Sequence, residues 1–139
     1  MAAALRRMMA DGTVPMLTSI PPCRKSGHRE YWLAALSIAR GLKVPLIDYY
    51  AEIMRRRPDD WNGRLAKFKE YRGREVPTLL SRDGTHPSNP AKWVKDFSEE
   101  ALNNSGYTLR NYMTLRMYAQ VIAKAYQPKD GQPASAPKP

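Results

Sequence analysis

The stretch Val44-Pro45-Leu46-Ile47-Asp48 sets the predicted fold of this chain of 139 residues. Its apolar part predicts a short buried strand over Val44 to Ile47. Asp48 follows at once, and an aspartate is typical of the residue that caps the start of a helix, because its carboxylate accepts a hydrogen bond from a free backbone N–H. We therefore predict a strand followed directly by a helix over Tyr49 to Arg57.

The same alternation of helix and strand precedes this stretch. Ala2 to Ala10 is rich in helix-forming residues and ends at Asp11-Gly12, where glycine suits a helix end. Val14 to Ile20 is a short apolar run closed by Pro21-Pro22, which favours a buried strand. Arg29 to Leu42 has the apolar spacing of an amphipathic helix. Helix, strand, helix, strand and helix in this order predict a right-handed parallel α/β unit.

The second half of the chain is predicted to close the domain. Arg64 to Arg74 alternates charged and apolar residues, which suits an exposed helix or an inserted excursion near the site. Ser98 is predicted to cap a short helix that ends near Asn103 to Gly106. Tyr107 to Tyr126 has the pattern of a long helix that packs along the sheet. Gln127 to Pro139 holds four prolines and predicts a flexible tail.

The polar stretch Ser81-Arg82-Asp83-Gly84-Thr85-His86-Pro87-Ser88 is the candidate site. The two residues between Asp83 and His86 suit a four-residue turn, whose first and last Cα atoms lie within about 7 Å. The Asp83 carboxylate could then accept the Nδ1 proton of His86 and leave Nε2 as a general base. Pro87 favours an extended backbone at the histidine, which displays it on a loop. The alternative is a purely structural turn, since Asp, Gly and Pro occupy turns for backbone reasons alone.

The block Asp83-Gly84-Thr85-His86-Pro87, between a strand and helix unit and a long final helix, resembles the last conserved block of the SGNH (GDSL-type) esterase and lipase family. The resemblance implies that Asp83 and His86 are two members of a Ser-His-Asp triad that hydrolyses esters. It also implies an α/β fold, the C-terminal part of a three-layer α/β/α, flavodoxin-like SGNH hydrolase fold with parallel strands. Residues 1–126 would hold the last two strands and their helices, followed by the tail over 127–139.

The other motifs of this family are not found in the sequence. It contains no Gly-Asp-Ser block and no Gly-x-Asn-Asp block, and no serine stands at a glycine-flanked turn between a strand and a helix. We therefore expect this chain to supply the Asp and the His, while the nucleophilic serine and oxyanion donors belong to a missing N-terminal part of the same domain. The implied substrate is a small-molecule ester. An acylated carbohydrate is preferred because Trp61 could stack on a sugar ring, although it could instead plug its loop onto the core.

A second hypothesis follows from charge. The chain carries 23 basic and 13 acidic residues, a formal net charge of +10, and its sharpest cluster is Arg55-Arg56-Arg57. Such an excess attracts polyanions, so the alternative function is a non-catalytic basic module that binds nucleic acid or another polyanion. Such an arginine run is more often a solvated helix end. The esterase hypothesis expects no specific nucleic-acid partner.

Metal and cofactor chemistry is not indicated. The single cysteine, Cys23, and the two histidines, His28 and His86, match no metal-ligand spacing, so we expect no cofactor and no metal. A thiol nucleophile formed by Cys23 with His86 is an alternative that we do not favour, because nothing around Cys23 favours its thiolate. Met1 to Met16 shows no export signal and no run reaches transmembrane length, which leaves the localisation open.

Overall fold

The computed structural model describes residues 1–24 and 27–125. The predicted alternation of helix and strand is confirmed, whereas the predicted tail over 127–139 lies outside the described residues. The elements, in chain order, are α1 (Ala2–Ala10), β1 (Leu17–Thr18), α2 (His28–Leu42), β2 (Leu46–Ile47), α3 (Tyr49–Arg56), the short 3-10 helices η1 (Ala66–Phe68) and η2 (Ala91–Trp93), α4 (Glu99–Asn104) and α5 (Gly106–Ala125).

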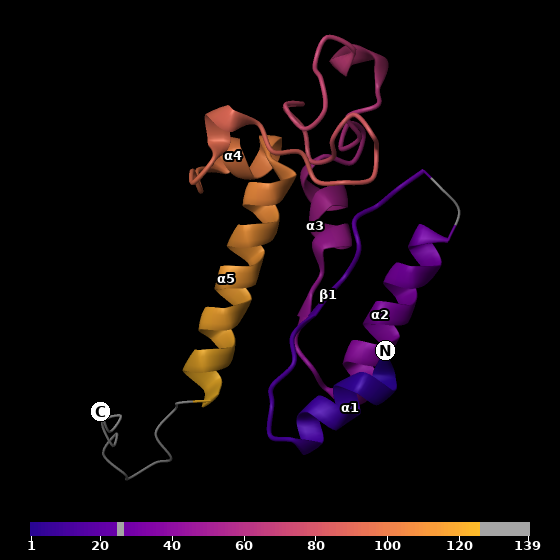
Figure 1. The fold of residues 1–139 in the computed structure, drawn as a ribbon, viewed down its shortest axis with the longest axis vertical. Helices are drawn as coiled ribbons and strands as arrows, with labels where there is room; N and C mark the ends of the chain where they lie inside the picture. Colours follow the sequence, from indigo (N-terminus) through magenta and orange to yellow (C-terminus); the bar gives the residue numbers. More distant parts are fainter. Residues whose placement is uncertain (25–26, 126–139) are drawn as a thin grey trace.

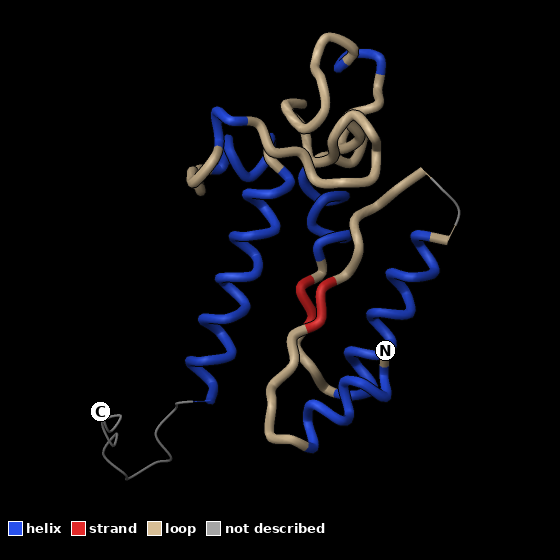
Figure 2. The backbone as a smooth tube through the Cα atoms, viewed as in Figure 1, coloured by secondary structure: helices blue, strands red, loops and turns tan. Residues whose placement is uncertain are grey.

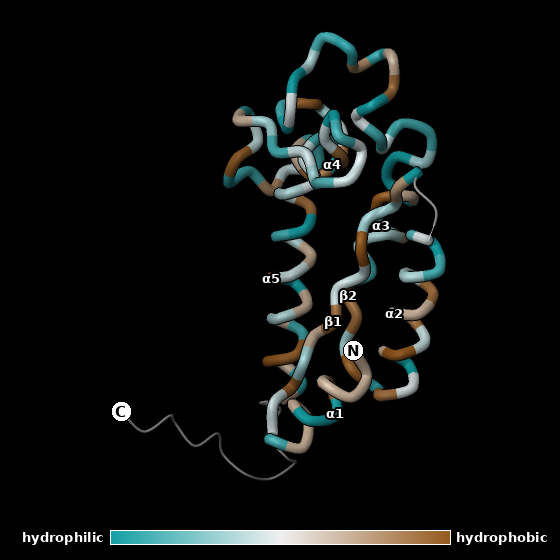
Figure 3. The backbone as a smooth tube through the Cα atoms, turned by 45° about the vertical axis from the view of Figure 1, so that its right-hand side comes forward, coloured by the Kyte–Doolittle hydropathy of each residue, from teal (hydrophilic) through white to brown (hydrophobic). Residues whose placement is uncertain are grey.

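The sheet consists of two parallel strands in the described part of the chain. Leu17 lies opposite Leu46, and Thr18 lies opposite Ile47. Both strands are shorter than predicted, and Pro45, which directly precedes β2, offers no backbone donor. The paired strands run between α2 and α5 in two different views (Figures 1 and 3). α2 contacts β1 and α5 contacts β2, so the described chain is a mixed α/β structure.

The predicted caps explain where α3 and α4 begin. Asp48 accepts a hydrogen bond from the Ala51 backbone N–H over 3.1 Å, and the same carboxylate accepts the Trp32 indole N–H over 2.9 Å. The Ser19 hydroxyl also donates to Asp48. One carboxylate therefore joins the end of β1, α2 and the start of α3. The Ser98 hydroxyl accepts from the Ala101 amide and caps α4 in the same way.

Between α3 and α4 the chain is mostly loop, drawn in tan in Figure 2. The Arg64 to Arg74 segment is therefore the predicted excursion and not a long helix, and only η1 forms within it. Single bridges hold the loop together, including one between Asn62 and Leu80. Its hydrophobic anchor is the core cluster of fully buried side chains Tyr49, Ile53, Leu79, Leu80, Leu102 and Leu109.

Most of this loop is hydrophilic, as the teal segments beyond α3 in Figure 3 show. Trp61 is an exception, since it is partly buried and packs against the core cluster. No helix among residues 1–24 and 27–125 is both long enough and apolar enough to cross a bilayer.

Candidate active site

The loop after Leu80 closes on itself through backbone hydrogen bonds. The Ser81 N–H donates to the His86 carbonyl over 2.8 Å, and the Gly84 N–H donates to the Ser81 carbonyl over 2.9 Å. Gly84 has a φ of +69°, a left-handed backbone that other residues rarely adopt. The glycine therefore permits the tight turn that brings Asp83 and His86 together.

The predicted contact between Asp83 and His86 is confirmed. Oδ2 of Asp83 lies 2.7 Å from Nδ1 of His86. Oδ1, the other carboxylate oxygen, accepts the Ser81 hydroxyl over 2.8 Å, the Thr85 N–H over 2.8 Å and the His86 N–H over 2.9 Å. The carboxylate is therefore held at both oxygens, which fixes its orientation toward the imidazole.

The hydrogen bonds also set the charge of Asp83. Partial burial acts to raise the pKa of this carboxyl, but the hydrogen bonds from the His86 amide and ring, the Thr85 amide and the Ser81 hydroxyl outweigh it. The pKa of Asp83 therefore lies well below its usual range, and the group is an anion at neutral pH. An anionic acceptor at Nδ1 keeps the proton on that nitrogen and leaves the lone pair of a neutral imidazole on Nε2.

The ring of His86 is accessible. Its side chain is 62% exposed and that of Asp83 is 50% exposed. No residue of the described chain hydrogen-bonds Nε2, so this nitrogen can accept a proton from an approaching group.

The loop that follows β1 lies beside this site. The Cys23 sulfur lies 3.9 Å from the Thr85 hydroxyl oxygen, which joins the two loops. At the other end of the same loop, the Pro21 carbonyl oxygen lies 3.3 Å from Nδ1 of His28, the first residue of α2. His28 therefore has a local contact at the start of α2 and none with the ring of His86.

None of the described serines hydrogen-bonds the ring of His86. Ser19 is buried, and its hydroxyl donates to the Asp48 carboxylate and accepts a hydrogen bond from the Tyr50 amide. Ser81 donates to Asp83, and Ser88 donates to the Thr78 carbonyl. The described residues thus contain an oriented base and no adjacent serine nucleophile.

The arginine run is engaged by partners within the described chain. Arg55 and Arg56 both pair with Glu52, and Arg57 pairs with Asp60. These contacts favour a structural role for the run over a phosphate grip. Trp61 packs against the core cluster. This contact favours the interpretation that Trp61 anchors its loop to the core over the interpretation that it stacks on a sugar ring.

The sequence assigned no role to two residues around the site, Ser81 and Arg64. Ser81 stands two positions before Asp83, a spacing at which a hydroxyl can reach a neighbouring side chain, so a signal was present. Arg64 left no signal, because its approach to Gly84 depends on a loop that folds back over many residues. In the described part of the chain, no group of three or more His, Cys, Asp and Glu side chains is placed to hold a metal ion.

The chain matches no protein-family model, no curated protein sequence and no solved structure. An exposed imidazole with an aspartate at Nδ1 and an accessible Nε2 is suited to take a proton from a nucleophile and return it to a leaving group.

Proposed function

We propose that this chain carries the His-Asp half of a Ser-His-Asp ester hydrolase of the SGNH type. The observation that supports the proposal most directly is the 2.7 Å contact between Asp83 Oδ2 and His86 Nδ1, with Oδ1 held by three further donors. The serine and the oxyanion donors would come from a segment that precedes residue 1 in the natural polypeptide.

The proposed reaction has two halves. The serine hydroxyl attacks the ester carbonyl carbon while its proton passes to Nε2 of His86, and Asp83 stabilises the resulting imidazolium. The tetrahedral intermediate then expels the alcohol, which takes the proton from Nε2, and an acyl-serine remains. Water attacks the acyl-serine by the same proton path, which releases the acid and restores the serine.

The arrangement of the sheet supports a missing part of the same domain. No strand of the described chain pairs with the outer edge of β1. On α5, the side chains of Leu115, Tyr118 and Ile122 are exposed at a spacing that places them on one helix face. We propose that further parallel strands extend the sheet at β1 into a three-layer, flavodoxin-like sheet, and that helices of the same part cover this apolar face.

The first experiment is to determine the intact mass and N-terminal sequence of the protein from its native host, and to assay that protein with p-nitrophenyl acetate. We expect a longer polypeptide with a serine-dependent turnover. His86→Ala should lower kcat by about 10⁴-fold or more, and Asp83→Asn by about 10⁴-fold. His28→Ala is the matched control, because the other histidine should leave turnover unchanged. Full activity in His86→Ala would exclude the triad assignment.

A second experiment needs only the 139-residue chain. In ¹⁵N NMR spectra, neutral His86 should carry its proton on Nδ1, because Asp83 accepts there. Asp83→Asn should weaken this tautomer preference, while Asp59→Asn, an exposed acid on the loop after α3, should not. A neutral His86 with its proton mainly on Nε2 in the wild-type chain would contradict the proposed role of Asp83.

A further inference from the structure

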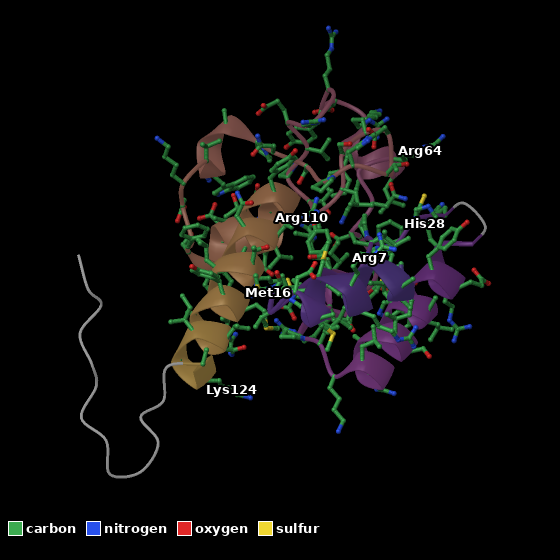
Figure 4. The ribbon with its side chains drawn as sticks, turned by 60° about the horizontal axis from the view of Figure 1, so that its bottom comes forward. Arg7, Met16, His28, Arg64, Arg110 and Lys124 are labelled. Atoms are coloured by element: carbon green, nitrogen blue, oxygen red, sulfur yellow. The ribbon has the colours of Figure 1, made fainter. Side chains whose placement is uncertain are left out.

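We infer that Arg64 is a specificity residue of this site and selects esters that also carry an anionic oxygen group, either a carboxylate or a phosphate. The inference rests on the proposed function and concerns the substrate class. Arg64 lies on the loop that follows α3 (Figure 4). A Cβ added to Gly84 would lie 2.5 Å from Cδ and 3.0 Å from Cγ of Arg64. The arginine stem therefore lies directly against the turn between Asp83 and His86.

The backbone around Arg64 is fixed to the same segment that carries the site. The Arg64 N–H donates to Asn62 Oδ1 over 2.9 Å, and the Gly63 N–H donates to the Leu80 carbonyl over 3.1 Å. Nη1 of Arg82 donates to the carbonyls of Gly63 and Leu65, which flank Arg64 on both sides. Since Arg82 is the neighbour of Asp83 in sequence, the arginine stem and the catalytic turn are held as one unit.

The guanidinium of Arg64 is available for a ligand. Arg64 is exposed, and no carboxylate of the described chain forms an ion pair with it. This distinguishes it from Arg55 and Arg57, whose guanidinium groups bind carboxylates of their own helix or loop. A guanidinium presents a planar set of donors that fits a carboxylate or a phosphate with two parallel hydrogen bonds.

The surrounding charge favours an anion. Lys69 and Arg72, on the same excursion, are exposed and form no ion pair within residues 1–24 and 27–125. The Arg82 N–H donates to the Gly73 carbonyl over 2.9 Å, which attaches this segment to the residues that carry the site. Unpaired cations near a binding site raise the local concentration of anionic ligands. An ester with a second, anionic group would therefore be oriented by Arg64 beside the imidazole of His86, whereas a neutral ester would lack this anchor.

The test is an NMR titration of the ¹⁵N-labelled chain, followed at the Gly84 and Thr85 amides and the His86 ring. Monomethyl succinate should produce saturable shifts, and its neutral counterpart methyl butyrate should produce none at the same concentration. Methyl phosphate serves as the phosphate arm, and whichever anion binds more tightly identifies the preferred group. Arg64→Gln, which keeps the stem but removes the charge, should weaken binding about tenfold. Arg40→Gln, an exposed arginine in the last turn of α2, is the control and should bind like the wild type.

A second measurement does not require a well-dispersed spectrum. Phenylglyoxal should modify Arg64 several-fold more slowly in the presence of monomethyl succinate than with methyl butyrate, as read by mass spectrometry of the peptides. Equal affinity in Arg64→Gln and wild type, or no preference for the anionic probe, would overturn the inference.

If the native protein hydrolyses neutral and anionic esters equally through His86, the proposed function stands and the specificity role fails. If the chain binds the anion but no His86-dependent turnover exists, the proposed function fails instead.

Discussion

Gly84 is the residue on which the geometry of the site depends most. Its φ of +69° disfavours any other residue, and an added Cβ would overlap the Arg64 stem at 2.5 Å. We expect Gly84→Ala to lower the free energy of unfolding by about 2 kcal/mol. Gly41→Ala is the contrast, because Gly41 lies in α2 with no atom within 4 Å of an added Cβ. That change should stabilise the protein by about 0.5–1 kcal/mol. Urea unfolding would measure both, and a neutral Gly84→Ala would contradict the described turn.

The pH dependence of stability at Asp83 follows from the direction of its pKa shift. The hydrogen bonds lower the pKa of this carboxyl in the folded state, so the unfolded chain binds its proton more readily. The stabilisation is therefore complete above the unfolded pKa of about 3.9 and is lost as the pH falls toward the folded value. We expect the difference in unfolding free energy between wild type and Asp83→Asn to shrink from pH 6 to pH 3. A constant difference over this range would contradict the hydrogen-bond geometry.

Arg57 joins three elements. It pairs with Asp60 and donates to the Pro77 and Asn103 carbonyls and to the Asn104 side chain, which ties α3 to the following loop and to α4. Hydrogen bonding from Arg57 lowers the pKa of Asp60 well below its usual range, against the opposite effect of burial.

A lysine cannot reproduce this set of bonds, because an ammonium lacks the planar fork of a guanidinium. We expect Arg57→Lys to lower the free energy of unfolding by about 2 kcal/mol. Arg55→Lys is the matched control, since the Arg55 side chain is 64% exposed, and it should change stability by less than about 0.5 kcal/mol. Thermal or urea unfolding distinguishes the two, and equal effects would contradict a joining role for Arg57.

The elements that the sequence predicted well are those decided by neighbouring residues. Asp48 both ends β2 and caps α3, and the contact between Asp83 and His86 spans only one turn. The loop between α3 and α4 was not predictable in the same way. Its shape depends on backbone bonds between distant residues, such as the Leu80 amide with the Trp61 carbonyl. For the same reason, the composition of this loop left both an exposed helix and an excursion near the site open, and it did not reveal the position of Arg64.

At the scale of the whole molecule, the outer edge of β1 is an unpaired strand edge in the described chain. The amides of Leu17 and Ser19 donate to the Pro45 and Ile47 carbonyls of the β2 segment. Side-to-side alternation along a strand then directs the Met16 and Thr18 amides to the opposite edge. No strand of the described chain pairs there. Unpaired strand edges are templates for pairing with another chain.

We therefore expect the 139-residue chain to self-associate at tens of micromolar, as measured by sedimentation velocity. Met16→Pro should reduce this association, because it removes an N–H at the outer edge and none of the bonds between β1 and β2. Met16→Ala is the matched control, since it shortens the side chain but keeps the N–H, and it should associate like the wild type. Equal association of the two variants would show that the apolar side chains, such as those of Leu115 and Tyr118, drive it and not the strand edge. A chain that stays monomeric would contradict an open edge at β1 and, with it, the proposal that further strands of the same domain pair there.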